Sequence, residues 1–262
     1  MVGCPRSGTT LTQSLLTAHP QVFSVPESHL YTRLSSRNRL LRRLGFARWD
    51  APESFARLTC ALGLPEKKPR GLTTRFYLEQ FARLLDVQAL AADKSVWLEK
   101  TPRHLYHLPE IERTLARAKF IHVLRDGADV VASLFEVTQQ HPEIWGGARS
   151  LDACIARWNK DVALSLRYQG HPNHFFVHYE ELTARPEETV RKIVAFVGLP
   201  FAPEVLETYR QASERVIAPG EAWKRSVGGR IHATGHQKLG RLFSPARQAY
   251  ILERTRTGRG AS

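Results

Sequence analysis

The sequence lacks any apolar run that approaches the roughly 20 residues needed by a transmembrane helix. It also lacks a charged and apolar leader that ends in a small-residue cleavage site. Its three cysteines, Cys4, Cys60 and Cys154, lie far apart and form no C-x-x-C pair, which excludes a zinc knuckle and indicates a reducing compartment. These absences predict a cytoplasmic protein with no membrane span.

The chain is also poor in acidic residues. Among its 262 residues, 25 Asp and Glu face 38 Lys and Arg, which gives a formal net charge of +13. Arginine supplies 29 of the 38 basic residues, and its planar fork fits phosphate and sulfate oxygens. The segments 33–48 and 223–262 are especially basic. A polyanionic ligand, a nucleic acid or an anionic membrane surface is therefore a candidate partner, although a GC-rich genome produces the same excess of arginine.

Short apolar segments alternate with helical patterns along the chain. Five strands are predicted, at Met1–Cys4, Val22–Val25, Val96–Leu98, Phe120–Leu124 and Phe175–Val177. Seven helices are predicted, at Thr9–Ala18, Phe76–Ala91, Pro109–Ala118, Ala128–Val137, Leu151–Tyr168, Pro186–Val197 and Pro245–Arg256. This order predicts an α/β fold: a P-loop-type, doubly wound, mostly parallel sheet of about five strands, flanked by helices and with a helical cap. Such sheets bind ligands at the carboxyl ends of their strands.

The length is typical of one domain. We expect a single domain over residues 1–256, with a variable cap or acceptor-side insertion over 30–76, and a flexible tail over 257–262. The first strand is short, because only Met1 and Val2 precede the next loop. This predicts either a missing upstream segment or a misassigned start.

A phosphate-binding loop is predicted directly after the first strand. Residues 3–10 read Gly-Cys-Pro-Arg-Ser-Gly-Thr-Thr, the P-loop frame G-x-x-x-x-G-x-T, and open a predicted helix whose N-terminus attracts anions. Thr9 replaces the lysine that reaches the terminal phosphates in nucleoside triphosphatases. We therefore assign Arg6, Ser7, Gly8, Thr9 and Thr10 to a smaller, diphosphate-like group that requires no metal.

A second anion site is predicted where the strand 120–124 ends. Arg125 leaves this strand, and Ser133 lies eight residues further along, about two helical turns, so both side chains share one face. A guanidinium fork and a hydroxyl together suit one phosphate group. The alternative is a salt bridge between Arg125 and Asp126 beside a surface serine.

Together the two motifs resemble those of the sulfotransferase superfamily, which uses 3′-phosphoadenosine 5′-phosphosulfate (PAPS). Residues 5–10 are similar to its 5′-phosphosulfate loop, and residues 125–133 to its 3′-phosphate motif, R-D-x-x-x-x-x-x-S. The resemblance runs from Val2 to about Phe243 and is greatest with the tyrosylprotein and bacterial branches. Further blocks in similar order are Ala18-His19-Pro20, Glu27, Lys100 before Pro102, Trp158-Asn159 and Val177–Leu182. The resemblance implies PAPS as co-substrate, its desulfated form PAP as product, and no metal.

The resemblance also implies the catalytic residues. Glu27 follows a predicted strand, and a glutamate at this position is the general base in the tyrosylprotein branch. Many other sulfotransferases use a histidine, and His29 lies two residues on, so both stay candidates. Lys100 leaves the strand 96–98 and matches the family's catalytic lysine, which stabilises charge on the leaving phosphate.

Two further ligands of the nucleotide are implied. Tyr179 matches the family's nucleotide-binding tyrosine, and Lys238 lies in a run that resembles the loop over the 3′-phosphate, with Lys224 as the competing lysine. The tyrosylprotein branch has another arginine four residues after the motif serine, where this chain has Val137, which weakens the case for a peptide tyrosine acceptor. No group of histidines has the spacing of a metal site, so none is predicted.

The sequence therefore predicts an enzyme that moves a sulfuryl group from PAPS to a hydroxyl. One alternative is a P-loop kinase or nucleoside triphosphatase, which the missing lysine opposes. Another alternative is a basic protein that binds nucleic acid or a membrane surface. This function is disfavoured because no aromatic residues interleave regularly with the arginines. No nucleic acid is expected as a partner. The class of hydroxyl acceptor and a homodimer stay open.

Overall fold

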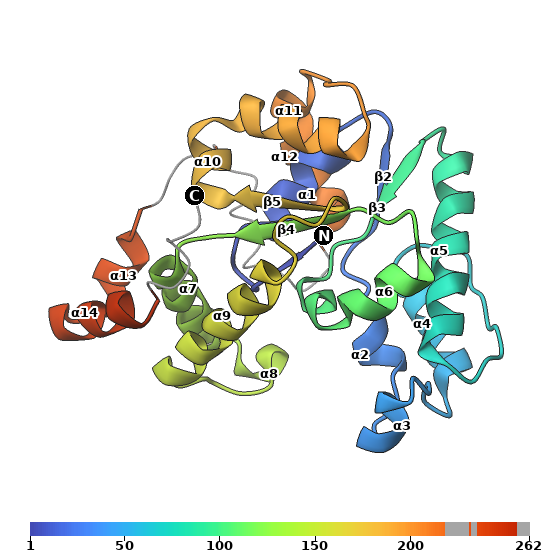
Figure 1. The fold of residues 1–262 in the computed structure, drawn as a ribbon, viewed down its shortest axis with the longest axis horizontal. Coiled ribbons are helices and arrows are strands. Elements are labelled where there is room, and N and C mark those ends of the chain that lie inside the picture. The colour runs from blue at the N-terminus through green and yellow to red at the C-terminus, as the bar shows by residue number, and fades with distance from the viewer. Residues whose placement is uncertain (218–230, 232–234, 256–262) are drawn as a thin grey trace.

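The structure, a computed structural model, describes residues 1–217, 231 and 235–255 (Figure 1). Its strands lie where the sequence predicts them: β1 (Val2–Gly3), β2 (Val22–Ser24), β3 (Val96–Leu98), β4 (Phe120–Leu124) and β5 (His174–His178). Every strand pair is parallel, in a three-stranded sheet of order β1-β4-β5 and a two-stranded sheet of β2 and β3. The predicted α/β class with parallel strands is confirmed, although the strands form two sheets instead of one.

Helices connect and cover these strands. In chain order the described helices are α1 (Thr9–Thr17), α2 (Leu30–Leu34), α3 (Arg39–Arg43), α4 (Ala51–Ala61), α5 (Thr74–Ala91), the 3₁₀ helix η1 (Pro102–His107), α6 (Leu108–Thr114), α7 (Gly127–Gln140), α8 (Pro142–Trp145), α9 (Leu151–Leu166), α10 (Tyr179–Ala184), α11 (Pro186–Val197), α12 (Val205–Val216), α13 (Gln237–Leu242) and α14 (Pro245–Arg254). All seven predicted helices are present. Most of the helices that the sequence analysis missed hold too few residues for a periodic apolar pattern.

Helices pack on both faces of β4. Ile121 and Val123 join the apolar cluster formed with α1, α11 and α12, whereas Leu124 joins the cluster formed with α7 and α9. Successive residues of a strand point to opposite faces, so β4 is buried along its whole length. Figure 1 shows α11 and α12 on one side of β4 and β5, and α7 and α9 on the other.

The segment from α2 to α5 lies at one end of the molecule, beside β2 and β3 (Figure 1). Leu34, Phe55 and Tyr77 are fully buried there and form an apolar cluster with Val2 of β1. The boundaries of the predicted domain and cap stay a prediction, and the predicted tail falls outside the described residues. Among the helices that the structure describes, none combines the length and the hydrophobicity of a membrane span.

The parallel arrangement explains where the predicted site residues gather. Within each sheet the strands run parallel, so the segments that follow them lie at one edge of that sheet, and the contact of Lys100 with Thr10 joins the two edges. The segments after β1, β2, β3, β4 and β5 carry the phosphate loop, Glu27, Lys100, Arg125 and Tyr179, respectively.

Candidate active site

The loop between β1 and α1 has the backbone of an anion cradle. The amide of Ser7 donates to the carbonyl of Cys4 (3.2 Å), and Gly8, directly before α1, has a left-handed φ of 94°. A Cβ at Gly8 would lie 2.2 Å from Cδ2 of Tyr179, so the loop packs directly on that ring. Thr9 and Thr10 follow in the buried first turn of α1. Glycine is therefore required at position 8 by both conformation and space.

The two predicted anion motifs meet in space. Nε of Arg6 donates to Oγ of Ser133 at 3.0 Å, across 127 residues of sequence. A guanidinium nitrogen of Arg125 lies 3.4 Å from the carbonyl oxygen of Arg6. The salt-bridge alternative requires a serine at the surface. Ser133 is instead buried on α7. Arg6, Arg125 and Ser133 therefore form one cationic and hydroxyl-bearing group.

Neighbouring side chains fix the position of Arg125. Its guanidinium lies over the Tyr179 ring, 4.3 Å from the ring centre, and 3.4 Å from a carboxylate oxygen of Asp129. Trp158 is buried and donates its indole N–H to the Arg125 carbonyl at 3.3 Å. Asp126 caps α7 by accepting from the amides of Ala128 and Asp129. Asp129 is missing from the predicted site, although its spacing of four residues from Arg125 could have revealed it.

The two predicted catalytic residues also contact each other. The ammonium of Lys100, which is fully buried, forms an ion pair with Glu27. The same ammonium lies 3.5 Å from the hydroxyl of Thr10 in the first turn of α1. Lys100 therefore links the phosphate loop to Glu27, whose side chain keeps 10% of its surface exposed.

His29 lies beside Glu27, with Nε2 3.4 Å from a Glu27 carboxylate oxygen. Burial lowers the pKa of His29, which the nearby carboxylates only partly offset. The shift favours the neutral imidazole, which is the form that a base needs. Glu27 and His29 thus stand side by side as candidates for the proton acceptor.

A buried network behind this pair centres on Glu99, which the sequence analysis does not single out. One carboxylate oxygen accepts from the hydroxyls of Ser28 (2.7 Å) and Thr101 (2.6 Å), and the other lies 3.0 Å from Nδ1 of His104. Burial favours the neutral acid, but His104 and Thr101 nevertheless hold the pKa of Glu99 well below its usual value. The network joins the segment after β2 to the segment after β3, and thereby fixes the spacing of Glu27 and Lys100.

Lys238 occupies a less direct position. It begins α13 and forms an ion pair with Glu136 of α7, three residues after Ser133. Arg241 pairs with the same carboxylate. Lys224 lies outside the described residues. The role of Lys238 in nucleotide binding stays a prediction.

Two groups of side chains place three ligand-type atoms within 4.8 Å of one another. One comprises Glu112, His171 and His174 near the start of β5, and the other comprises Asp126, Asp129 and His236 near Arg125. Asp126 already caps α7, and His174 already bonds Glu112 at 2.9 Å and His122 at 2.8 Å. These contacts account for the groups without a metal, and the absence of a metal stays a prediction.

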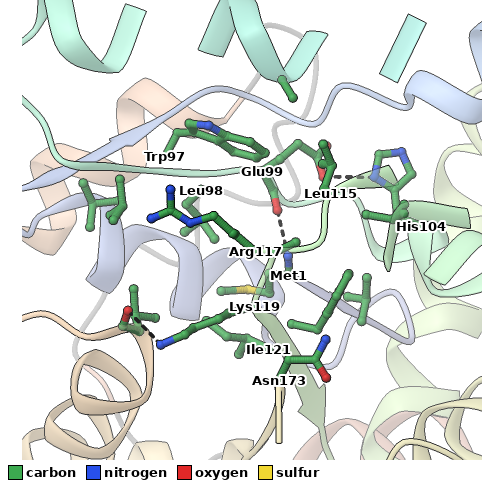
Figure 2. A pocket seen from close by; sticks show the side chains of 18 of the residues that line it. Met1, Trp97, Leu98, Glu99, His104, Leu115, Arg117, Lys119, Ile121 and Asn173 are labelled. Carbon is green, nitrogen blue, oxygen red and sulfur yellow. Dashed lines mark hydrogen bonds and ion pairs between the residues drawn. The ribbon is translucent and has the colours of Figure 1, made fainter. Parts of the chain in front are cut away.

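A cavity of about 1080 Å³ lies beside this site (Figure 2). Figure 2 shows Ile121 and Asn173, near the amino ends of β4 and β5, on one side of it, and Trp97, Leu98, Glu99 and His104, from β3 and the segment after it, around the rest. None of the predicted site residues lines it. The anion-binding motifs lie at the loop after β1 and not in this cavity, so we place the candidate active site at the loop.

Comparisons with known proteins identify the family. A model of the sulfotransferase family matches residues 1–203. The chain belongs to the sulfotransferase family. It is 28% identical over 208 residues to the protein-tyrosine sulfotransferase of Drosophila melanogaster, covering 78% of this chain and 38% of the fly protein. It is 26% identical over 216 residues to the nodulation protein NoeE of Sinorhizobium fredii, covering 76% and 49%. The resemblance seen in the motifs is confirmed.

Solved structures of sulfotransferases share the fold. The sulfotransferase domain from the curacin biosynthetic pathway has a TM-score of 0.59 at 19% identity, covering 96% of this chain and 95% of its own. A mouse sulfotransferase complexed with PAP has a TM-score of 0.57 at 14% identity, covering 100% of this chain and 83% of the mouse chain. The chain spans only 38% to 54% of the length of the protein-tyrosine sulfotransferases from fly, chicken and zebrafish. Family membership thus does not by itself assign their substrates to this chain.

Proposed function

We propose that this protein transfers the sulfuryl group of PAPS to a hydroxyl acceptor. The observation that carries the proposal is the position of Lys100. Its buried ammonium contacts both Glu27 and the Thr10 hydroxyl of the phosphate loop, so one cation joins an anion cradle to a carboxylate base. Transfer to a hydroxyl requires both of these features close together.

The residues present fit a nucleotide that carries two separate anionic groups. The loop backbone, with Arg6 and the hydroxyls of Thr9 and Thr10, suits the 5′-phosphosulfate, since backbone amides and a helix N-terminus favour negative charge. Arg125 and Ser133 suit the 3′-phosphate, because a guanidinium and a hydroxyl bind one phosphate together. Tyr179, under Arg125, offers a ring on which adenine stacks. Lys238, from α13, supplies a further cation to the 3′-phosphate.

The proton and the leaving charge have separate destinations in this proposal. The acceptor oxygen forms a bond to sulfur while the bond from sulfur to the 5′-phosphate oxygen breaks. The acceptor's proton passes to the carboxylate of Glu27, and the ammonium of Lys100 stabilises the charge that develops on the departing phosphate. Mixed charge in one buried site makes both roles stronger than they would be in water.

The acceptor contacts the residues that surround Glu27. His29 and the start of α2 lie closest in sequence, and Tyr31 of α2 stacks on His107 with ring centres 4.1 Å apart. Residues 30–76 therefore select the acceptor in this proposal.

Turnover of PAPS tests the proposal. The protein is incubated with PAPS and with tyrosine peptides, phenols, sugars and hydroxylated lipids, and release of PAP is measured. We expect PAP release to depend on the acceptor, and Glu27→Gln to lower kcat by roughly a hundredfold to ten-thousandfold with little change in PAP affinity. His29→Gln is expected to cost less than about tenfold.

Two results would overturn parts of this proposal. If the protein releases no PAP, either with any acceptor or without one, sulfuryl transfer is contradicted. Loss of turnover in His29→Gln with normal turnover in Glu27→Gln moves the base to His29. Glu143→Gln, at a surface carboxylate that is 66% exposed, is the matched control and should turn over normally.

A further inference from the structure

Large apolar side chains lie exposed together on the segment that contains α3. Leu40, Leu44 and Trp49 are 66%, 62% and 94% exposed, and Leu72 is 77% exposed. The basic apolar patch consists of Arg37, Arg39, Leu40, Leu41, Arg42, Arg43, Leu44, Phe46, Trp49 and Leu72, all of which are exposed. Single exposed apolar residues are ordinary, but a cluster of this kind marks an interaction surface.

Backbone hydrogen bonds hold the patch together. The amide of Phe46 donates to the carbonyl of Leu41 at 2.9 Å, and the amide of Ala47 donates to the carbonyl of Leu72 at 2.8 Å. The side chain of Asn38 caps α3 by accepting from the amides of Leu40 and Leu41. The residues before and after the patch are anchored, because Leu34 and Ala51 are fully buried. The apolar side chains are therefore presented by an ordered segment.

The charge of the patch has one sign. Residues 33–48 contain six arginines and no acidic residue. Arg48 is neutralised by Asp50, at 2.7 Å. Arg37, Arg39, Arg42 and Arg43 form no ion pair within the part of the chain that the structure describes. The patch therefore combines exposed leucine and tryptophan with uncompensated positive charge.

We propose that the basic apolar patch docks the protein on an anionic lipid bilayer. Leucine and tryptophan enter the boundary between headgroups and acyl chains, while flexible arginine side chains reach the lipid phosphates. In Figure 1, α3 lies at an extremity of the molecule, away from β4 and β5, so a flat surface can approach it. This docking is separate from the proposed sulfuryl transfer and does not depend on it.

The composition of the patch favours a bilayer over the other occupants. A nucleic acid backbone binds arginine but offers little to exposed leucines. A second copy of the chain would bring four unpaired arginines against another four, which opposes association. An anionic bilayer satisfies the arginines and the leucines together.

Vesicle sedimentation tests the proposal with the whole chain. The probes are vesicles of phosphatidylcholine alone and of an equal mixture with phosphatidylglycerol. We expect the protein to sediment with the mixed vesicles and much less with phosphatidylcholine, and the binding to weaken as salt rises from about 0.05 to about 0.5 M. The fluorescence of Trp49, obtained as the difference between wild type and Trp49→Phe, should shift to shorter wavelength on binding.

Two variants separate the charged and apolar contributions. Arg39→Gln/Arg42→Gln/Arg43→Gln should lower the partition coefficient about a hundredfold, which is about fivefold for each arginine. Trp49→Ser/Leu72→Ser should lower it about tenfold or more at both salt concentrations. Val87→Ser/Leu90→Ser is the matched control, because both residues are exposed on α5 (60% and 79%) outside the patch, and it should bind as wild type does.

Each other outcome would overturn the proposal. The first is that the protein does not bind mixed vesicles. The second is that wild type and both patch variants bind them equally. The third is that the protein binds duplex DNA tightly but no vesicles, and that only the arginine variant loses the DNA binding. A dimer in solution that Trp49→Ser/Leu72→Ser converts to a monomer would assign the patch to a second copy. PAP binding by calorimetry, measured on each patch variant, confirms that the variants are folded and separates failure of this proposal from failure of sulfuryl transfer.

Discussion

The ion pair between Glu27 and Lys100 provides a quantitative test of the site's architecture. Lys100 is fully buried and Glu27 nearly so, and the two side chains are in direct contact. The perturbation is a double-mutant cycle that comprises Glu27→Gln, Lys100→Met and the double variant. Glutamine and methionine approximate the shapes of the native side chains and remove their charges.

The magnitude follows from the burial of the pair. Removing one partner of a buried pair leaves a charge in a medium of low polarity, which costs about 3–5 kcal/mol of unfolding free energy. Removing both partners leaves no such charge, and the double variant should lie within about 1–2 kcal/mol of wild type. The coupling energy should therefore be at least about 2 kcal/mol. Lys192 and Glu188, a pair of 2.6 Å on the surface of α11, should give less than about 0.5 kcal/mol.

Urea unfolding at neutral pH, followed by circular dichroism, measures all four proteins of each cycle. Linear extrapolation gives the free energies, and equal slopes show that only stability has changed. The reasoning is refuted if the coupling energy of Glu27 and Lys100 is no larger than that of Glu188 and Lys192. The two catalytic candidates would then be solvated independently, and the proposed division of proton and phosphate charge would lose its basis.

Three further changes test other parts of the structure. Gly8→Ala should lower the free energy of urea unfolding by about 2–3 kcal/mol, because the new Cβ would lie 2.2 Å from the Tyr179 ring and the backbone φ is 94°. Gly8→Ala/Tyr179→Ala removes the contact but keeps the unfavourable φ, so it should recover only part of the lost free energy. Burial and the neighbouring His174 lower the pKa of His122 to about 3 in the folded protein. The unfolded chain, in which the pKa of histidine is about 6.5, therefore binds more protons than the folded chain. The free energy of unfolding consequently falls as the pH drops below about 6.5. From about pH 7.5 to about pH 5 this loss is about 2 kcal/mol, and His122→Phe should show a pH dependence weaker by that amount. β1 pairs with only two residues of β4, whereas β5 pairs with all five. Adding about five apolar, strand-forming residues before Met1 should extend this pairing and raise Tm by a few degrees. Adding five glycine and serine residues there should leave Tm unchanged.

Much of the candidate site could be predicted because its chemistry is encoded locally. The loop from Gly3 to Thr10 has fixed spacing within a single turn, and Arg125 and Ser133 lie only eight residues apart, just before and within α7. The parallel order of the strands then brings both to one edge, which explains why Arg6 bonds Ser133. A local pattern together with a rule for strand ends was enough for this part.

The contacts that could not be predicted join distant segments through buried polar atoms. Ser28 and Glu99 lie 71 residues apart, and neither forms a recognisable motif with the other. Lys238 meets Glu136 only because α13 packs against α7, and no periodicity in the sequence reveals that packing. Such pairs depend on the final placement of whole elements, and this placement is set by the sum of many weak contacts.

Strand and helix positions were predictable to a similar degree. β4 is a short apolar segment bounded by charged residues, and burial on both faces explains that pattern. The division into two sheets was not predictable, since it depends on how few residues of β1 form a ladder. α12 was missed although Val205, Tyr209 and Val216 recur on one buried face, which is a signal that a count of spacings could have found.

Calorimetric titration with PAP tests the central claim most directly. We predict saturable binding to one site, no tighter binding of ATP with Mg²⁺, and a loss of about tenfold to a hundredfold in each of Arg6→Ala and Arg125→Ala, since each removes a charge-assisted hydrogen bond worth about 1.5–3 kcal/mol. The losses in the double variant should be less than additive, because Arg125 contacts Arg6. Unchanged PAP affinity in both single variants, or tighter binding of ATP with Mg²⁺ than of PAP, would contradict the account.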